Sequence, residues 1–258
     1  MDTSHLFDLK GKTAIVTGGA NGIGKASCEM LAAFGAQVVV SDYNLEAAQK
    51  ASEEINSNGG KSIAIDCDVT KDEALVHLAD KTIAEFGSIE ILVNNVGGGG
   101  AGKESPYDMD VAQFKKVFEM NVFSMWRLCQ LVAPHMKKAG YGSIINMSSM
   151  AAINKSPAIS AYASSKAAIN HMTRNLAFDY GPDEIRINAI GPGAVRTDAL
   201  NSVLTPEIEK RMLAHTPIHR LGEVEDIAGA VLYFAAPISS WVSGQVLFVN
   251  GGGVQTLN

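Results

Sequence analysis

The sequence predicts an α/β fold in which one parallel, doubly wound sheet has helices on both faces. Seven short runs rich in Val and Ile are almost continuously apolar, as strands buried on both faces are. Longer stretches with apolar residues at helical spacing separate these runs, so strand and helix alternate along the 258 residues. This repetition predicts right-handed crossovers and a ligand site at the carboxyl ends of the strands.

Each element follows from this alternation in chain order. The expected strands are 13–16, 37–40, 62–65, 89–93, 143–147, 185–190 and 245–249. The expected helices are 22–34, 45–58, 71–86, 110–139, 158–180 and 223–236. No linker, repeat or biased segment divides the chain, so we expect a single dinucleotide-binding catalytic domain over 1–258. An apolar helical segment near 198–216 is expected to form a flap over the substrate site.

Composition and charge exclude several classes of protein. Hydrophobic residues make up 47% and charged residues 19%, which excludes a disordered chain. The net charge of −6 argues against nucleic acid or an anionic membrane as a partner. No apolar run approaches the ~18 residues of a membrane span, and the N-terminus has no apolar signal region. Three widely spaced cysteines predict reduced, buried thiols in a cytoplasmic protein, and no His or Cys spacing predicts a metal site.

The first expected strand leads directly into a glycine-rich turn, and a helix follows it. Gly18, Gly22 and Gly24 allow a sharp turn and a close approach of the backbone to a pyrophosphate. The N-terminus of the following helix favours that negative charge. A strand before the turn and a helix after it therefore predict dinucleotide binding, with Gly18 and Asn21 among the contacts.

Asp42 ends the second expected strand and predicts the identity of the cofactor. It lies 18 residues after Gly24, close to the spacing of ~20 expected for an acid that binds the ribose. A carboxylate there accepts hydrogen bonds from the 2′-hydroxyl and repels a 2′-phosphate. Tyr43 follows it, and no Lys or Arg lies between Gly19 and Asn21, so the sequence predicts NAD rather than NADP. The alternative is an exposed turn residue.

Three more of the expected strands are followed by loops with candidate site residues. Asp68, with Val69 beside it, is placed to face an adenine amino group, although a helix N-cap before Lys71 explains the same spacing equally well. Asn95 and the Pro-Gly turn at 192–193 follow the fourth and sixth strands. We therefore expect these loops to meet at one edge of the sheet.

Tyr162 and Lys166 are four residues apart in an expected helix and so share one face. The ordinary Tyr pKa of ~10 is too high for a base at neutral pH. A Lys cation ~5 Å away at an effective dielectric of ~20 lowers that pKa by ~2. Tyr162 could then take a proton from an alcohol or give one to a ketone, although this spacing alone is common by chance.

Two further polar residues accompany this pair. Ser149 directly follows a strand, 13 residues before Tyr162, and its hydroxyl can hydrogen-bond a reacting oxygen as charge develops on it. A capping or turn role explains Ser149 as well. Asn121 lies inside an apolar helical stretch, where it either serves the site or is a satisfied core amide.

These motifs, in this order, resemble the short-chain dehydrogenase/reductase family over essentially the whole chain. The resemblance implies a single-domain Rossmann fold with a seven-stranded parallel sheet in the order 3-2-1-4-5-6-7. It implies Tyr162 as the acid/base, Lys166 as the residue that lowers its pKa and binds the nicotinamide ribose, and Ser149 as the group that polarises the substrate oxygen. Asn121 would hold a water of the proton relay, and 195–197 would hold the carboxamide. Family members are usually tetramers or dimers, and we expect a homotetramer.

Several other stretches resemble the hydroxysteroid dehydrogenases of bacteria within this family, among them the four glycines at 97–100 and the segments 149–152, 215–222 and 240–245. This resemblance implies reversible, NAD-dependent oxidation of the 7α-hydroxyl of a bile acid to the ketone. The implied NAD contacts are Ile23, Asp42, Tyr43, Asp68, Val69, Asn95, Tyr162, Lys166, Val195 and Thr197. The implied bile-acid contacts are Gly99, Ser149, Asn154 and Tyr162.

The chain departs from the family pattern at Val96, where Ala is usual, and around 103–107, where additional residues lengthen the loop at the mouth of the pocket. An alternative enzyme acts on another alcohol or ketone, such as a 3-oxoacyl carrier-protein thioester or a sugar. Acyl reduction normally favours NADPH, against which Asp42 argues. A regulator that binds NAD without turnover is expected to lack Tyr162, Lys166 or Ser149, all of which are present.

Overall fold

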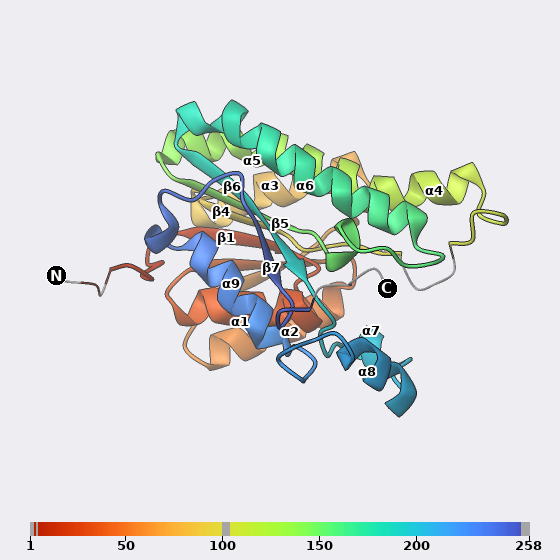
Figure 1. Ribbon diagram of the computed structural model, residues 1–258. Coiled ribbons are helices and arrows are strands. Elements are labelled where there is room, and N and C mark those ends of the chain that lie inside the picture. Colours follow the sequence, from red (N-terminus) through yellow and green to blue (C-terminus); the bar gives the residue numbers. More distant parts are fainter. Residues whose placement is uncertain (1–2, 4, 100–103, 254–258) are drawn as a thin grey trace.

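The strands form one parallel sheet in the order β3-β2-β1-β4-β5-β6-β7, and Figure 1 draws the computed structural model that contains it. The structure describes residues 3, 5–99 and 104–253. The strands are β1 Thr13–Thr17, β2 Gln37–Asp42, β3 Lys61–Asp66, β4 Ile91–Asn94, β5 Gly142–Met147, β6 Ile185–Pro192 and β7 Val246–Val249. This order confirms the fold class that the sequence predicted.

Helices cover both faces of the sheet (Figure 1). One layer consists of α1 Gly22–Ala33, α2 Leu45–Ser57 and α9 Val224–Ala235. The other consists of α3 Asp72–Phe86, α5 Ser124–Ala139 and α6 Ser160–Tyr180. Successive strand residues alternate between the two apolar clusters, so Val16 packs with the first layer and Ile15 with the second. Burial on both faces is the physical reason for the nearly continuous apolar runs.

The segment predicted as one helix over 110–139 is divided by a π-helical turn. α4 (Val111–Phe118) leads into η1 (Glu119–Phe123), and α5 begins at Ser124. A π turn adds one residue to the helical ladder and is frequent at functional sites. Here it buries Asn121, whose side chain reaches Gly98. The spacing of apolar residues does not reveal a single extra residue, so the prediction of one continuous helix was wrong at this point.

The predicted flap contains two short helices, α7 (Asp198–Asn201) and α8 (Pro206–Leu213). Each begins after a Thr whose hydroxyl accepts a backbone N–H, at Thr197 and at Thr205. Figure 1 shows both helices projecting beyond the carboxyl edge of the sheet. The described 3₁₀ turns are η2 Met150–Ala152, η3 Gly181–Asp183 and η4 Pro237–Ser239.

The three cysteines, Cys28, Cys67 and Cys129, are free and buried, as predicted. Over the ranges that the structure describes, no helix has the length and apolar character to cross a bilayer.

Candidate active site

The loops that carry the predicted site residues meet at the carboxyl edge of the sheet. In the strand register, Val16 of β1 pairs with Val93 of β4, and Asn94 pairs with Asn146 of β5. Asn94 donates a hydrogen bond to Asn146 (2.9 Å), which in turn donates to Thr173 of α6 (3.0 Å). This buried polar chain ties the two central strands to the helix that carries Tyr162 and Lys166.

The glycine turn is held in a conformation that its glycines make possible. Gly18 and Gly22 have φ of +62° and +54°, a region that residues with a Cβ rarely adopt. A Cβ on Gly24 would lie 1.9 Å from the carbonyl oxygen of Gly18. The amide of Asn95 donates to the carbonyl oxygens of Thr17 (3.0 Å) and Gly18 (3.1 Å). Asn95 therefore clamps the turn from the neighbouring strand, a task that the sequence did not reveal.

Asp42 is buried at the end of β2, with 7% of its surface exposed, so the alternative of an exposed turn residue was wrong. One carboxylate oxygen accepts the N–H of Ala20 in the glycine turn (3.2 Å), and the other accepts the N–H of Asn44 (3.1 Å). Tyr43 beside it is 83% exposed. The carboxylate thus joins the second strand to the glycine turn.

A cavity of about 490 Å³ opens between the glycine turn and the ends of β2, β3 and β4. It is lined by Gly18, Asp42, Tyr43, Cys67, Asp68, Val69, Thr70, Asn95, Val96, Gly97 and Met120. Half of the cofactor contacts that the sequence and the resemblance implied therefore gather here. The other six, Asn21, Ile23, Tyr162, Lys166, Val195 and Thr197, do not line it.

Asp68 fixes the floor of this cavity through a local turn. Its carboxylate accepts the backbone N–H (3.0 Å) and the hydroxyl (2.7 Å) of Thr70. These hydrogen bonds hold the pKa of Asp68 below its ordinary value. The alternative of a helix N-cap was wrong, because α3 begins at Asp72 after Lys71 and has no side-chain cap; Asp68 orders the turn before the helix and lines the cavity.

Val195 and Thr197 lie on the other side of the glycine turn. Val195 pairs with Gly222 in an isolated parallel bridge, and Thr197 begins α7. The methyl group of Thr197 lies 3.6 Å from the position that a Cβ on Gly22 would occupy. The loop after β6 thus approaches the glycine turn from the flap side.

Ser149, Tyr162 and Lys166 converge where β5 meets α6. Ser149 follows β5, and its hydroxyl accepts the N–H of Ala151 (3.1 Å). Lys166 is 3% exposed, and its Nζ donates to the carbonyl oxygen of Met147 (2.8 Å). The same Nζ lies 5.6 Å from the centre of the Tyr162 ring. The i, i+4 spacing read from the sequence is therefore realised on one face of α6.

The electrostatics of this group differ from the expectation. Burial raises the pKa of Tyr162, a hydrogen bond from Ser149 lowers it, and the charge of Glu104 raises it further. The expected lowering by Lys166 was wrong, because Lys166 is not among the groups that shift this pKa and the cost of removing a phenolate from water prevails. Burial also lowers the pKa of Lys166, to about 8. Tyr162 is thus neutral at neutral pH, and Lys166 titrates close to that range.

Asn121 has its side-chain amide engaged on both sides. Its oxygen accepts the N–H of Gly98 (2.8 Å), and its nitrogen donates to the carbonyl of Gly98 (3.0 Å) and to the hydroxyl of Ser165 (2.8 Å). Ser165 in turn donates to the carbonyl of Tyr162 (2.7 Å). Asn121 therefore connects the glycine segment after β4 to the helix of Tyr162.

A second cavity, of about 350 Å³, lies beside Ser149 under the flap. Residues from η2, the end of β6, the flap and the chain after β7 line it, and they include Ser149, Asn154, Gly193, Arg211, Met212, His215 and Asn250. Of the implied bile-acid contacts, Ser149 and Asn154 face this cavity. Gly99 lies instead against Tyr162 and Glu104.

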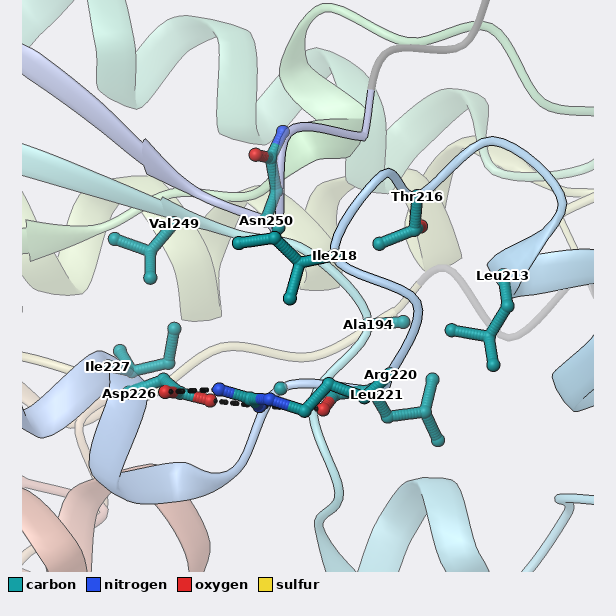
Figure 2. Close-up of a pocket in the computed structure, with 12 residues that line it drawn as sticks. Ala194, Leu213, Thr216, Ile218, Arg220, Leu221, Asp226, Ile227, Val249 and Asn250 are labelled. Atoms are coloured by element: carbon teal, nitrogen blue, oxygen red, sulfur yellow. Dashed lines mark hydrogen bonds and ion pairs between the residues drawn. The ribbon is translucent and has the colours of Figure 1, made fainter.

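A smaller cavity of about 180 Å³ lies behind the flap and is drawn in Figure 2. Leu213, Ile218 and Leu221 surround it, and Arg220 forms a two-pronged ion pair with Asp226 (2.6 and 2.9 Å). Arg220 holds the pKa of Asp226 down, to about 2. This pair fastens the segment after α8 to the first turn of α9, and only the charges of the two residues could have indicated it in the sequence.

Comparison with known proteins gives a consistent result. A family model described as Enoyl-(Acyl carrier protein) reductase matches residues 18–253. The 7alpha-hydroxysteroid dehydrogenase of Escherichia coli (strain K12) is 54% identical over 258 residues, which is all of both chains.

Two solved structures extend the comparison. A 7 alpha-hydroxysteroid dehydrogenase complexed with NADH and 7-oxo glycochenodeoxycholic acid superposes with a TM-score of 0.95 at 53% identity, covering all of both chains. A short-chain type dehydrogenase/reductase from Mycobacterium marinum superposes with a TM-score of 0.92 at 32% identity, covering 99% of this chain and 100% of the other. With the glycine turn, the Ser-Tyr-Lys group and the strand order in place, the chain belongs to the short-chain dehydrogenase/reductase family.

Proposed function

We propose that the protein is an NAD-dependent oxidoreductase that interconverts the 7α-hydroxyl group of a bile acid and the corresponding ketone. The observation that carries the proposal is the 54% identity, over the full length of both chains, with the 7alpha-hydroxysteroid dehydrogenase of Escherichia coli. The convergence of Ser149, Tyr162 and Lys166 near a cavity under the flap supports the same class of reaction.

The larger cavity supports NAD as the cofactor. Asp42 uses one lone pair of each oxygen for backbone N–H groups, which leaves lone pairs for the ribose hydroxyls. Among the described residues that line the cavity there is no Lys or Arg, so a 2′-phosphate would meet the charge of Asp42 without a compensating cation. We assign further contacts to Gly18, Asn21, Ile23, Tyr43, Asp68, Val69, Asn95, Val195 and Thr197. When bound, NAD supplies the hydride acceptor of the reaction.

The side chains of the site would transfer the proton and stabilise the charges that this transfer creates. During oxidation, Tyr162 takes the proton of the substrate hydroxyl, and the Ser149 hydroxyl donates a hydrogen bond to the same oxygen. Lys166, anchored on Met147, stabilises the phenolate with its positive charge and contacts the nicotinamide ribose. Asn121 already donates both amide hydrogens, so a relay water held by its side chain must donate to its oxygen.

The flap supports a large, mostly apolar substrate. Met150 and Met212 present flexible apolar side chains to the cavity beside Ser149, and such side chains adapt to irregular ligands. Asn154 lies on the same wall and would contact a polar group of the steroid, and Gly99 would border the opposite side. The second cavity thus supports a bulky alcohol.

Two features support a homotetramer in the cytoplasm. Aromatic side chains that are normally covered lie exposed on α5 and α6, at Trp126 and Phe178, and after α9, at Trp241. Free, buried cysteines fit a reducing compartment. Sedimentation equilibrium of the purified protein tests the assembly, and a single monomeric species would contradict it.

The decisive experiment measures NAD reduction by the purified protein with cholate and, separately, with deoxycholate, which lacks the 7α-hydroxyl. We expect turnover of cholate alone, and slower turnover when NADP replaces NAD. Turnover of both bile acids would place the reacting hydroxyl elsewhere on the steroid. Turnover of neither would direct the search to acyl thioesters and sugars.

A further inference from the structure

Glu104 is a buried carboxylate that the mechanism above does not use. It lies in the lengthened loop after β4 and is 6% exposed. Its Oε2 accepts the backbone N–H of Tyr162 (3.0 Å). Its own N–H donates to the carbonyl of Ala158 (3.0 Å), and its backbone forms an isolated parallel bridge with Ile159. Side chain and backbone together thus fasten this loop to the start of α6.

The first turn of α6 takes a hydrogen-bond acceptor from outside the helix. Its N-cap residue, Ile159, has no side chain that can accept a backbone N–H, although the first backbone N–H groups of a helix lack partners within it. The preceding residue, Ala158, has a φ of +54°, which a residue with a Cβ rarely adopts. The Glu104 carboxylate provides the missing acceptor, and its charge is favoured at a helix N-terminus.

Glu104 also bounds the glycine segment that faces Tyr162. A Cβ on Gly99 would lie 2.8 Å from Oε1 of Glu104 and 3.3 Å from the Cβ of Tyr162. Gly98 is held from the other side by Asn121. The glycine segment therefore lies between Asn121, which binds it, and Glu104, which packs against it and also accepts the backbone N–H of Tyr162.

We propose that Glu104 is a positioning residue for Tyr162: its carboxylate caps the first turn of α6 from the loop after β4 and so fixes the Tyr162 hydroxyl with respect to Ser149. The catalytic part of this inference rests on the proposed function, because it takes Tyr162 as the acid/base. Among the residues that the structure describes, the hydroxyl of Ser149 and the ammonium group of Lys166 also face Tyr162.

Three variants test the proposal. Glu104→Gln keeps an oxygen that can accept the Tyr162 N–H but removes the charge, and Glu104→Ala removes both. Asp110→Ala is the matched control, because Asp110 caps α4 in the same way, accepting the N–H of Gln113 (2.7 Å), without touching Tyr162.

In steady-state oxidation of cholate, we expect Glu104→Ala to lower kcat about tenfold through misplacement of the acid/base, with the KM for NAD unchanged. Glu104→Gln should restore kcat to within about twofold, as expected of a retained hydrogen bond, and should shift the pH-rate profile to lower pH, because the charge of Glu104 raises the pKa of Tyr162. An unchanged kcat in Glu104→Ala, or an equal loss in both variants, would overturn the positioning role.

Hydrogen exchange of the amides at 160–166 supplies a measurement that needs no substrate. Exchange should accelerate in Glu104→Ala and stay as in the wild type in Asp110→Ala. If the wild type does not oxidise cholate but this exchange pattern appears, the proposed substrate fails while the cap stands. If exchange in Glu104→Ala matches the wild type, the cap fails. Should Glu104→Ala not fold, Glu104→Asp replaces it in both measurements: the shorter side chain should lose the contact, and wild-type kcat with wild-type exchange would overturn the proposal.

Discussion

A cation is buried at each of two edges of the sheet, the amino edge and the carboxyl edge of its strands. The two cations differ in how many hydrogen bonds they make. At the amino edge, Arg186 of β6 is 8% exposed and donates to the carbonyl of Phe234 (2.8 Å), the hydroxyl of Ser239 (2.9 Å) and the hydroxyl of Tyr141 (3.3 Å). At the carboxyl edge, Lys166 is more deeply buried, yet within the described ranges its ammonium group makes one hydrogen bond, to Met147.

This difference distinguishes a buried charge that stabilises the fold from a buried charge that serves the site. A buried charge is costly unless hydrogen bonds replace those it made with water. The set of acceptors around Arg186 meets that demand and joins β6 to the end of α9. Lys166 retains part of the cost, which appears as the lowering of its pKa to about 8, and a buried cation with so perturbed a pKa is typical of a functional site.

Removing the acid/base should have the largest effect. Tyr162→Phe deletes the hydroxyl that exchanges the proton, and we expect kcat to fall by about 10²–10⁴-fold. NAD affinity, measured by fluorescence titration or calorimetry, should stay close to the wild-type value. Substantial residual activity would show that another group at the carboxyl edge does this work.

Lys166→Met, also at the carboxyl edge, should lower the activity but raise the stability. We expect activity to fall by a similar order, while the free energy of unfolding at pH 7 rises by about 1 kcal/mol, because a poorly compensated buried charge is gone.

The rise in unfolding free energy expected for Lys166→Met should become smaller as the pH increases. Since the Lys166 pKa is about 8 when folded and 10.5 ordinarily, the unfolded chain binds more protons between these values, and wild-type stability rises with pH there. The advantage of Lys166→Met should therefore be full below pH 8 and disappear above pH 10.5. Urea unfolding at pH 7 and at pH 10 measures it, and a destabilised variant at pH 7 would contradict this account of the site.

Arg186→Met should give the reverse pattern. It removes the hydrogen bonds to Phe234, Ser239 and Tyr141, and we expect the loss to lower the unfolding free energy by about 1–3 kcal/mol. The Phe234 carbonyl keeps Ser143 and Ser239 as donors. The kcat should remain near that of the wild type, because the residue lies at the far edge of the sheet. A loss of kcat without a loss of stability would contradict the structural role of Arg186, and the two buried cations would then no longer differ in role.

Asp42→Ala should have the smallest effect of the series. Without the carboxylate, the repulsion of a 2′-phosphate is gone, and we expect the preference for NAD over NADP in kcat/KM to fall about tenfold, because like charges about 4 Å apart repel by at least about 1 kcal/mol even in water. The hydrogen bond from Ala20 is lost as well, so NAD binding itself should weaken slightly. An unchanged ratio of the two cofactors would place the selectivity elsewhere.

Features that depend on neighbours in the chain were predictable from the sequence. The glycine turn stands between a strand and a helix, and Tyr162 and Lys166 lie one helical turn apart. The order of the strands came from the resemblance rather than from periodicity, which cannot rank strands within a sheet. The additional residues around 103–107 were noticed as a longer loop, but nothing in that loop indicated that Glu104 would be buried. Lys103 lies outside the described residues.

The sequence by itself determined the alternation of strand and helix, the dinucleotide turn and the Tyr-Lys pair, because each is encoded by periodicity or by spacing within one element. The tertiary structure alone decided the π turn at Asn121, the clamp by Asn95 on the glycine turn, and the contact of Glu104 with α6. The clamp and the Glu104 contact join residues that are far apart in the chain, and a hydrogen bond across such a distance depends on packing that local propensity does not encode. The π turn itself is local, but the contact of Asn121 with Gly98 that accompanies it is of the same long-range kind. The balance of charges around Tyr162 belongs to the same group, because burial, which dominates its pKa, is a property of the folded chain.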